Sequence, residues 1–156
     1  YYLFTASVYE SKYRALDNVW RKGRFSNDFN TNFLAGKEFR VGDPAKNKSL
    51  SVDIKFTVIG ANRYTPVDAE ASVLADEEVL REDVPYSKRG DTIFIANISG
   101  RYKKNNPKTT HIFKFEINNA TNNKAVIGEY YDEALNEVVQ DYQLELIPNI
   151  MYVLQF

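Results

Sequence analysis

The chain has 156 residues, of which 44% are hydrophobic and 26% charged, and its formal net charge is −1. This balance gives no reason to expect nucleic-acid binding, because a surface that binds phosphate needs a basic excess. Without cysteine, and with His111 as the only histidine, the chain offers no disulfide, no cysteine nucleophile and no typical zinc site. We therefore expect neither an enzyme nor a cofactor.

Hydrophobic residues recur with a period of two along almost the whole chain, which is typical of strands with two unlike faces. In chain order, strands are predicted over residues 2–8, 29–41, 50–59, 94–102, 111–117 and 138–156. The pattern is clearest after position 50, where Leu50, Val52 and Ile54 alternate with polar residues. About ten such residues are enough for a tilted strand to cross a bilayer. The prediction is an all-β fold of about six antiparallel strands.

The last predicted strand is the longest, and its apolar face runs from Val138 to Phe156. Within it, Pro148 has no N–H to donate to a neighbouring strand. We therefore expect a local β-bulge at Pro148 rather than the end of the strand.

The faces opposite the apolar ones carry too much charge for a dry protein core. We expect the apolar faces to point outward toward lipid and the polar faces to line the interior of a barrel. There, the polar side chains would pair across neighbouring strands or contact a plug. The residues assigned to the interior are Tyr9, Glu38, Arg40, Asp53, Lys55, Lys114, Glu116, Asp141 and Glu145.

The predicted connections alternate between long and short, at 14–27, 42–48, 60–90, 103–108 and 121–137. Outer-membrane barrels have long extracellular loops and short periplasmic turns. The alternation therefore predicts that the first strand runs outward and that the C-terminus lies in the periplasm. This localisation would be the outer membrane of a Gram-negative cell.

The chain ends with apolar residues at alternating positions, namely Ile150, Tyr152, Leu154 and Phe156. This pattern resembles the C-terminal signature by which the barrel-assembly machinery recognises outer-membrane barrels. The resemblance implies that these four residues form a barrel-assembly signal.

Five segments resemble strand motifs of TonB-dependent receptors from Bacteroidetes: 1–13 (YYLFTASVYESKY), 35–38 (AGKE), 63–68 (RYTPVD), 119–122 (NATN) and 142–148 (YQLELIP). The resemblance implies a 22-stranded barrel with an N-terminal plug, which uses energy delivered through TonB to import a scarce ligand. Six strands are too few to close around lipid, because bacterial barrels begin at eight. We therefore expect residues 1–156 to be the C-terminal strands of such a barrel, without the plug and the earlier strands.

The same resemblance implies several partners. They are outer-membrane lipid and lipopolysaccharide, the remaining strands and plug of the receptor, and, through the full-length protein, TonB and the barrel-assembly machinery. The ligand would belong to the siderophore, haem, glycan or peptide class.

The candidate ligand contacts are Arg63, Tyr64 and Asp68, at the entry of the longest loop. The acidic residues that follow up to Asp83 match no calcium-binding spacing and favour a solvated loop with a short helix. Two alternatives stay open. One is a soluble β-barrel that binds a small ligand in an apolar interior, and the other is a subunit of an oligomeric outer-membrane pore.

Overall fold

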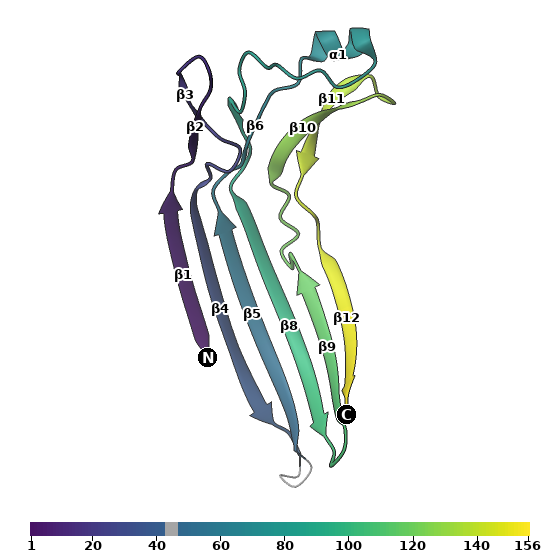
Figure 1. The fold of residues 1–156 in the computed structure, drawn as a ribbon. Coiled ribbons are helices and arrows are strands. Elements are labelled where there is room, and N and C mark those ends of the chain that lie inside the picture. Colours follow the sequence, from purple (N-terminus) through teal and green to yellow (C-terminus); the bar gives the residue numbers. More distant parts are fainter. Residues whose placement is uncertain (43–46) are drawn as a thin grey trace.

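The computed structural model describes residues 1–42 and 47–156, and its main feature is one antiparallel sheet (Figure 1). In order of pairing, the strands are β1 (Tyr2–Tyr9), β4 (Asp28–Arg40), β5 (Lys48–Ile59), β8 (Ile93–Asn105), β9 (Thr110–Asn118) and β12 (Ile147–Gln155). The predicted all-β fold and the six strands are confirmed. The sheet is open, because β1 and β12 do not pair with each other among the described residues.

Smaller elements lie in the connections. They are the ribbons β2 (Lys12–Arg14) with β3 (Trp20–Lys22), β6 (Arg63–Tyr64) with β7 (Lys88–Arg89), and β10 (Val126–Asp132) with β11 (Glu137–Tyr142), and the helix α1 (Ala69–Ala75). Figure 1 shows all of them gathered at one end of the sheet, which we call the loop end. The short helix expected in the acidic loop is α1.

The predicted connection lengths are confirmed for the four connections that lie wholly within the described residues. The long connections, 10–27, 60–92 and 119–146, meet at the loop end, whereas residues 106–109 make a short turn at the opposite end (Figure 1). The other short connection was expected at 42–48, and its residues 43–46 lie outside the described residues. The C-terminus lies at the end with the short turn of residues 106–109.

The strand register places apolar residues opposite one another on one face of the sheet. Phe33 pairs with Phe56, and Ile54 pairs with Ile98. The ring of Phe56 stacks between those of Phe33 and Phe94, with centroids 6.4 and 6.1 Å away. The apolar face comprises Tyr2, Phe4, Ala6, Val8, Phe29, Phe33, Ala35, Phe39, Leu50, Val52, Ile54, Phe56, Val58, Phe94, Ala96, Ile98, Tyr102, Phe113, Phe115, Ile117, Pro148, Ile150, Tyr152 and Leu154. Lys37 interrupts it, with its ammonium 5.2 Å from the ring centroid of Phe39.

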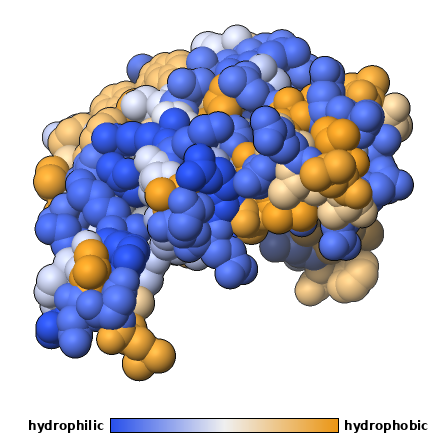
Figure 2. Space-filling model, turned by 90° about the horizontal axis from the view of Figure 1, so that it is seen from above, coloured by the Kyte–Doolittle hydropathy of each residue, from blue (hydrophilic) through white to orange (hydrophobic). Residues whose placement is uncertain are grey.

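This apolar face is largely open to its surroundings. The exposed fractions of Ile150 and Phe4 are 81% and 62%. Among the described residues, the buried hydrophobic side chains are only Ala61, Val67, Ile93, Ala96, Ala125 and Tyr131. Seen from the loop end, the molecule has the outline of an arch (Figure 2). The surface that faces the viewer is mostly hydrophilic, and hydrophobic side chains follow part of the outer side of the arch. The sheet therefore does not enclose a hydrophobic core of its own.

The last predicted strand is corrected in two ways. It is divided into β11, which pairs with β10, and β12, which pairs with β9, because residues 143–146 belong to neither strand. The predicted bulge at Pro148 is wrong, since Pro148 pairs with Ile117 in an unbroken register. Because of this division, Asp141 and Glu145 lie outside the six-stranded sheet, and Glu145 pairs with Lys124 at 2.5 Å instead.

Candidate functional site

Arg63 and Tyr64, two of the candidate ligand contacts, lie next to each other in β6 at the loop end. They pair with Arg89 and Lys88 of β7. The backbone nitrogen of Arg63 also donates to the carbonyl of Arg24 at 3.1 Å. Its side-chain Nε is buried and has no hydrogen-bond partner among the described residues. Arg63 therefore joins the segment after β3 to the longest loop.

Tyr64 lies in a partly buried and negatively charged environment. Burial raises the pKa of its phenol, and the nearby charge of Glu129 raises it further. Glu129 is itself held in place, since it accepts hydrogen bonds from the ammonium of Lys88 at 2.8 Å and the backbone nitrogen of Val67 at 2.9 Å. The phenol of Tyr64 thus stays protonated at neutral pH and keeps a hydrogen to donate.

Asp68, the third candidate, caps helix α1. Its carboxylate accepts a hydrogen bond from the backbone nitrogen of Ala71 at 3.0 Å, which satisfies a donor that the first turn of a helix leaves free. No hydrogen bond or ion pair between described residues joins its side chain to Arg63 or Tyr64. This structural role accounts for an aspartate at position 68, and ligand contact by it stays a prediction.

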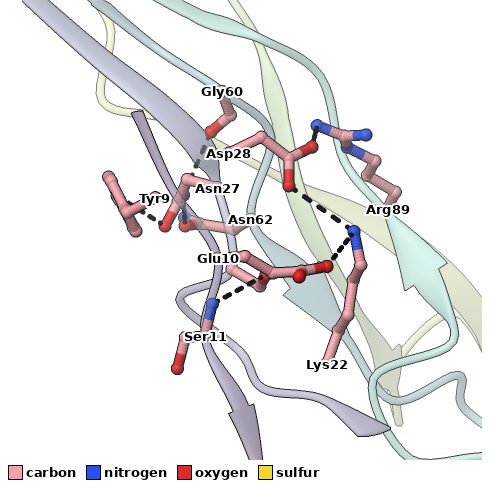
Figure 3. A network of polar contacts seen from close by, with 10 residues as sticks. Tyr9, Glu10, Ser11, Lys22, Asn27, Asp28, Gly60, Asn62 and Arg89 are labelled. Atoms are coloured by element: carbon pink, nitrogen blue, oxygen red, sulfur yellow. Dashed lines mark hydrogen bonds and ion pairs between the residues drawn. The ribbon is translucent and has the colours of Figure 1, made fainter. Parts of the chain in front are cut away.

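A polar network ties the loop end to the sheet (Figure 3). At its centre, the side-chain amide of Asn27 donates to the carbonyl of Gly60 at 3.0 Å and also bonds Asn62. The hydroxyl of Tyr9 donates to the amide oxygen of Asn27 at 3.3 Å. A Cβ at Gly60 would collide with the backbone carbonyl of Asn27, so only glycine fits there. These contacts connect the ends of β1, β4 and β5.

Ion pairs extend this network to two further connections. The carboxylate of Asp28 lies 2.6 Å from the guanidinium of Arg89 and 3.7 Å from the ammonium of Lys22. Lys22 also lies 3.1 Å from Glu10 (Figure 3). The residue after β1 and the last residues of β3 and β7 are thereby fixed to the start of β4. A network of several charges holds a geometry better than an isolated surface pair.

Beside this network, a cavity of about 670 Å³ opens between the β2–β3 ribbon and the longest loop. We call it the loop cavity, and the lining residues that matter here are Tyr13, Arg24, Phe25, Thr65, Glu82 and Tyr86. The rings of Tyr13 and Tyr86 meet edge to face, with centroids 6.1 Å apart. The backbone nitrogen of Tyr86 donates to the hydroxyl of Thr65 at 3.2 Å. Sequence reasoning missed this site, because its lining residues are up to 75 positions apart, from Ser11 to Tyr86, and no spacing relates them.

The polar face of the six-stranded sheet forms a second hollow. The predicted interior residues Glu38, Asp53, Lys55 and Glu116 share this face, as the strand register requires. It holds a cavity of about 320 Å³. Asp53 bonds the hydroxyls of Tyr1 and Ser99, and Lys114 pairs with Glu116 at 2.6 Å. The expected pairing across neighbouring strands is seen for Asp53, which bonds Ser99 of β8, whereas Lys114 and Glu116 pair within the single strand β9.

Ile150, Tyr152 and Leu154, the first three residues of the expected assembly signal, lie on the apolar face of β12. The hydroxyl of Tyr152 lies 2.8 Å from Nδ1 of His111, and its ring lies 4.8 Å from that of Phe113. Phe156 follows the strand and is almost fully exposed. In the described part of the chain β12 pairs only with β9, so it forms one edge of the sheet.

Two kinds of feature are missing from residues 1–42 and 47–156. No three histidine, aspartate or glutamate side chains are grouped closely enough to hold a metal ion. Nor is any helix long and apolar enough to span a membrane.

The chain matches no known protein family, no curated protein and no solved structure. The function must therefore be argued from the faces of the sheet and the loop end.

Proposed function

We propose that the chain forms neighbouring strands of an outer-membrane β-barrel that belongs to a TonB-dependent receptor and imports a scarce ligand. One observation carries the proposal: an exposed apolar face extends over all six strands, opposite a face rich in charge. Apolar patches of this extent are unusual on soluble monomers and mark an interaction surface. A lipid bilayer is the environment that matches it.

The direction of the two faces supports lipid contact rather than a soluble barrel. A membrane barrel presents apolar residues outward and polar residues to its interior, whereas a soluble ligand-binding barrel does the reverse. Here the polar face contains the hollow with Asp53, Arg101 and Glu116. The strands of 8 to 13 residues are also close to the length that crosses a bilayer at the usual tilt.

The open edges support a larger barrel. Strand edges in hydrocarbon leave backbone groups without partners, which costs several kcal/mol for each group. Since β1 and β12 each have one free edge among the described residues, both need further strands. In the proposed receptor these come from the same chain. In an oligomeric pore, β1 of one copy would pair with β12 of another.

Two observations support import. Several segments resemble TonB-dependent receptors, and the two ends of the sheet differ, since the long connections all lie at one of them. The long connections carry the polar network and the loop cavity, as expected of an extracellular surface that captures a ligand. The residues expected to form the assembly signal follow β12 toward the other end. No covalent chemistry is required of this chain.

The membrane environment is tested with a pair of single-cysteine variants, since the chain has no cysteine of its own. Ile98→Cys places a thiol on the apolar face, and Ser99→Cys places one on the polar face of the same strand. Each is labelled with a fluorophore in the protein reconstituted into vesicles. We expect a quencher attached to lipid chains to quench the label at position 98 and to spare the label at 99. Equal quenching at both positions would contradict a lipid-facing sheet.

Import is tested in cells that lack the gene. Growth is measured with iron supplied as a siderophore or haem, and with glycans or peptides as the sole nutrient. We expect these cells to grow poorly with one of the ligand classes. Cells that keep the gene but lack TonB should show the same growth defect.

The protein is also extracted from outer membranes with detergent, and its mass and N-terminal sequence are determined. A water-soluble protein of only these residues would contradict the proposal. Pairing of β1 of one copy with β12 of another would identify an oligomeric pore instead.

A further inference from the structure

The loop cavity has the size and composition of a small-ligand site. Pockets of roughly 300 to 1,000 Å³ hold drug-sized molecules, and this cavity, which is broadly open to solvent, measures about 670 Å³. Three aromatic rings, those of Tyr13, Phe25 and Tyr86, line it. Phe25 is 67% exposed although it is one of the largest apolar side chains. A bound apolar group would cover this ring and be stabilised by it.

Two charges of opposite sign share the same cavity. The guanidinium of Arg24 lies 5.7 Å from the ring centroid of Phe25, and Glu82 lies on the side of the longest loop. Neither forms an ion pair within the described part of the chain, although Arg81 and Asp83, on either side of Glu82, pair with each other at 2.9 Å. The cavity therefore offers one free cation and one free anion beside aromatic walls.

The walls are held before any ligand arrives. Arg24 is fixed through its carbonyl, which accepts from the backbone nitrogen of Arg63, and Tyr86 is fixed by Thr65. The ion pairs of Asp28 with Arg89 and Lys22 tie the ribbon to the longest loop. Such preorganisation lowers the conformational entropy lost on binding.

We infer that the loop cavity binds a short peptide with free termini and a large apolar or aromatic side chain. Its carboxylate would pair with Arg24, its ammonium with Glu82, and its side chain would contact Phe25 and Tyr86. A neutral glycan offers Arg24 and Glu82 only uncharged hydroxyl groups, and a polyanionic ligand meets the repulsion of Glu82. The biological meaning rests on the proposed import function, which this inference narrows to the peptide class.

The first experiment measures equilibrium binding to the full-length protein purified in detergent. The probe is a tripeptide of phenylalanine between two glycines, in its free, N-acetylated, C-amidated and doubly blocked forms. Each block removes one charge and leaves the aromatic side chain. We expect the free peptide to bind tightest and each block to weaken binding about three- to tenfold, as for partly exposed charge-assisted contacts.

Two variants assign each end of the peptide. Arg24→Gln should weaken binding of the free peptide and no longer distinguish it from the C-amidated form. Glu82→Gln should do the same for N-acetylation. Arg14→Gln and Glu133→Gln are the matched controls, since they remove the same charges from loop-end residues that do not line the cavity. They should bind all four forms as the unaltered protein does.

A third variant fills the cavity. A Cβ at Gly23 would meet only ordinary neighbours, 3.7 Å from the hydroxyl of Ser11 and 4.0 Å from the ring of Tyr13. Gly23→Leu should therefore fold normally and reduce binding at least tenfold. Gly128→Leu is the control, because a Cβ there also has ordinary contacts but lies away from the cavity.

The outcomes separate this inference from the import function. Equal affinity for the four peptide forms would overturn the inferred peptide site, and so would unchanged peptide binding by Gly23→Leu. Binding of a glycan, haem or siderophore to the protein that Gly23→Leu abolishes would also overturn it. If cells import another ligand normally with Gly23→Leu, the import function stands and the peptide site fails. If the peptide binds as expected but TonB removal has no effect on its uptake, the site stands and the import proposal fails.

Discussion

The phenol of Tyr1 lies across Gly36 and donates its hydroxyl hydrogen to the carboxylate of Asp53, two strands away on the polar face. The backbones of Tyr1 and Gly36 also exchange two hydrogen bonds, at 3.0 and 3.1 Å. A Cβ at Gly36 would collide with both the phenol and the carboxylate. The aromatic ring thus covers the site where the glycine has no side chain of its own, a known way to stabilise a strand glycine.

Gly36→Ala should therefore destabilise the folded protein. Overpacking of this kind costs about 1 to 3 kcal/mol, because side chains must leave their favoured positions. Gly100→Ala is the control, since it is also a strand glycine but has open space where the Cβ would lie. Guanidinium unfolding in detergent should show a lower midpoint for Gly36→Ala only. A lower midpoint for Gly100→Ala of the same size would mean that the loss of strand glycine, rather than the contact with Tyr1, matters.

An arginine on the apolar face should hinder insertion, whereas one on the polar face should not. Ile98→Arg places a charge in the middle of β8 on the proposed lipid side, where it costs about 2 to 4 kcal/mol at the bilayer midplane. Ser99→Arg places the same charge next to Asp53 on the polar face. The folded fraction in vesicles, read from mobility on unheated gels, should fall for the first variant and stay near normal for the second.

In the proposed barrel, Phe156 should matter for assembly rather than for the stability of the folded protein. Phe156 makes little contact with the rest of the sheet, being 98% exposed. Phe156→Ala should therefore lower the amount of protein in outer membranes, while the molecules that do assemble unfold at an unchanged temperature. Gln155→Ala, next to it in sequence, is the control. A reduced unfolding temperature in Phe156→Ala would assign the residue a packing role instead.

The sheet was predictable because its information is local. Alternation in segments such as 50–59 encodes both the strand and its two faces, since neighbouring side chains must point to opposite sides. Sequence reasoning places β10 in a loop and joins β11 to β12 as one long strand, because the alternation continues from Val138 to Phe156. The turn between β10 and β11 has Asn136 at a φ of 56°. Asparagine tolerates this left-handed region, and this residue was the available signal.

The candidate site was only partly predictable. Arg63 and Tyr64 were placed correctly at the loop end, whereas Asp68 already showed the pattern of a helix cap before the acidic run. The loop cavity depends on contact between Tyr13 and Tyr86, which lie 73 positions apart. Only the pairing of the strands and of the small ribbons brings such residues together, and periodicity in one segment carries no information about it.

The β2–β3 ribbon should lose a stabilising contact only in strong acid. The carboxylate of Asp17 accepts two hydrogen bonds from the guanidinium of Arg21, at 2.5 and 3.0 Å, and one from the backbone nitrogen of Val19 at 3.1 Å. These bonds, chiefly those of Arg21, lower the pKa of Asp17 from 3.8 to about 2. Because the folded pKa is the lower one, this stabilisation is complete above pH 3.8 and is lost as the pH falls through 2.

Trp20, the only tryptophan of the chain, lies beside Arg21 in β3 and reports on this contact. The difference in fluorescence between the protein and its Trp20→Phe variant should stay constant from pH 7 to about 4 and change with a midpoint near 2. In Asp17→Asn the same signal should be independent of pH, because an amide cannot be protonated in this range. A midpoint close to 3.8 in the unaltered protein would mean that the bonds from Arg21 do not persist in solution.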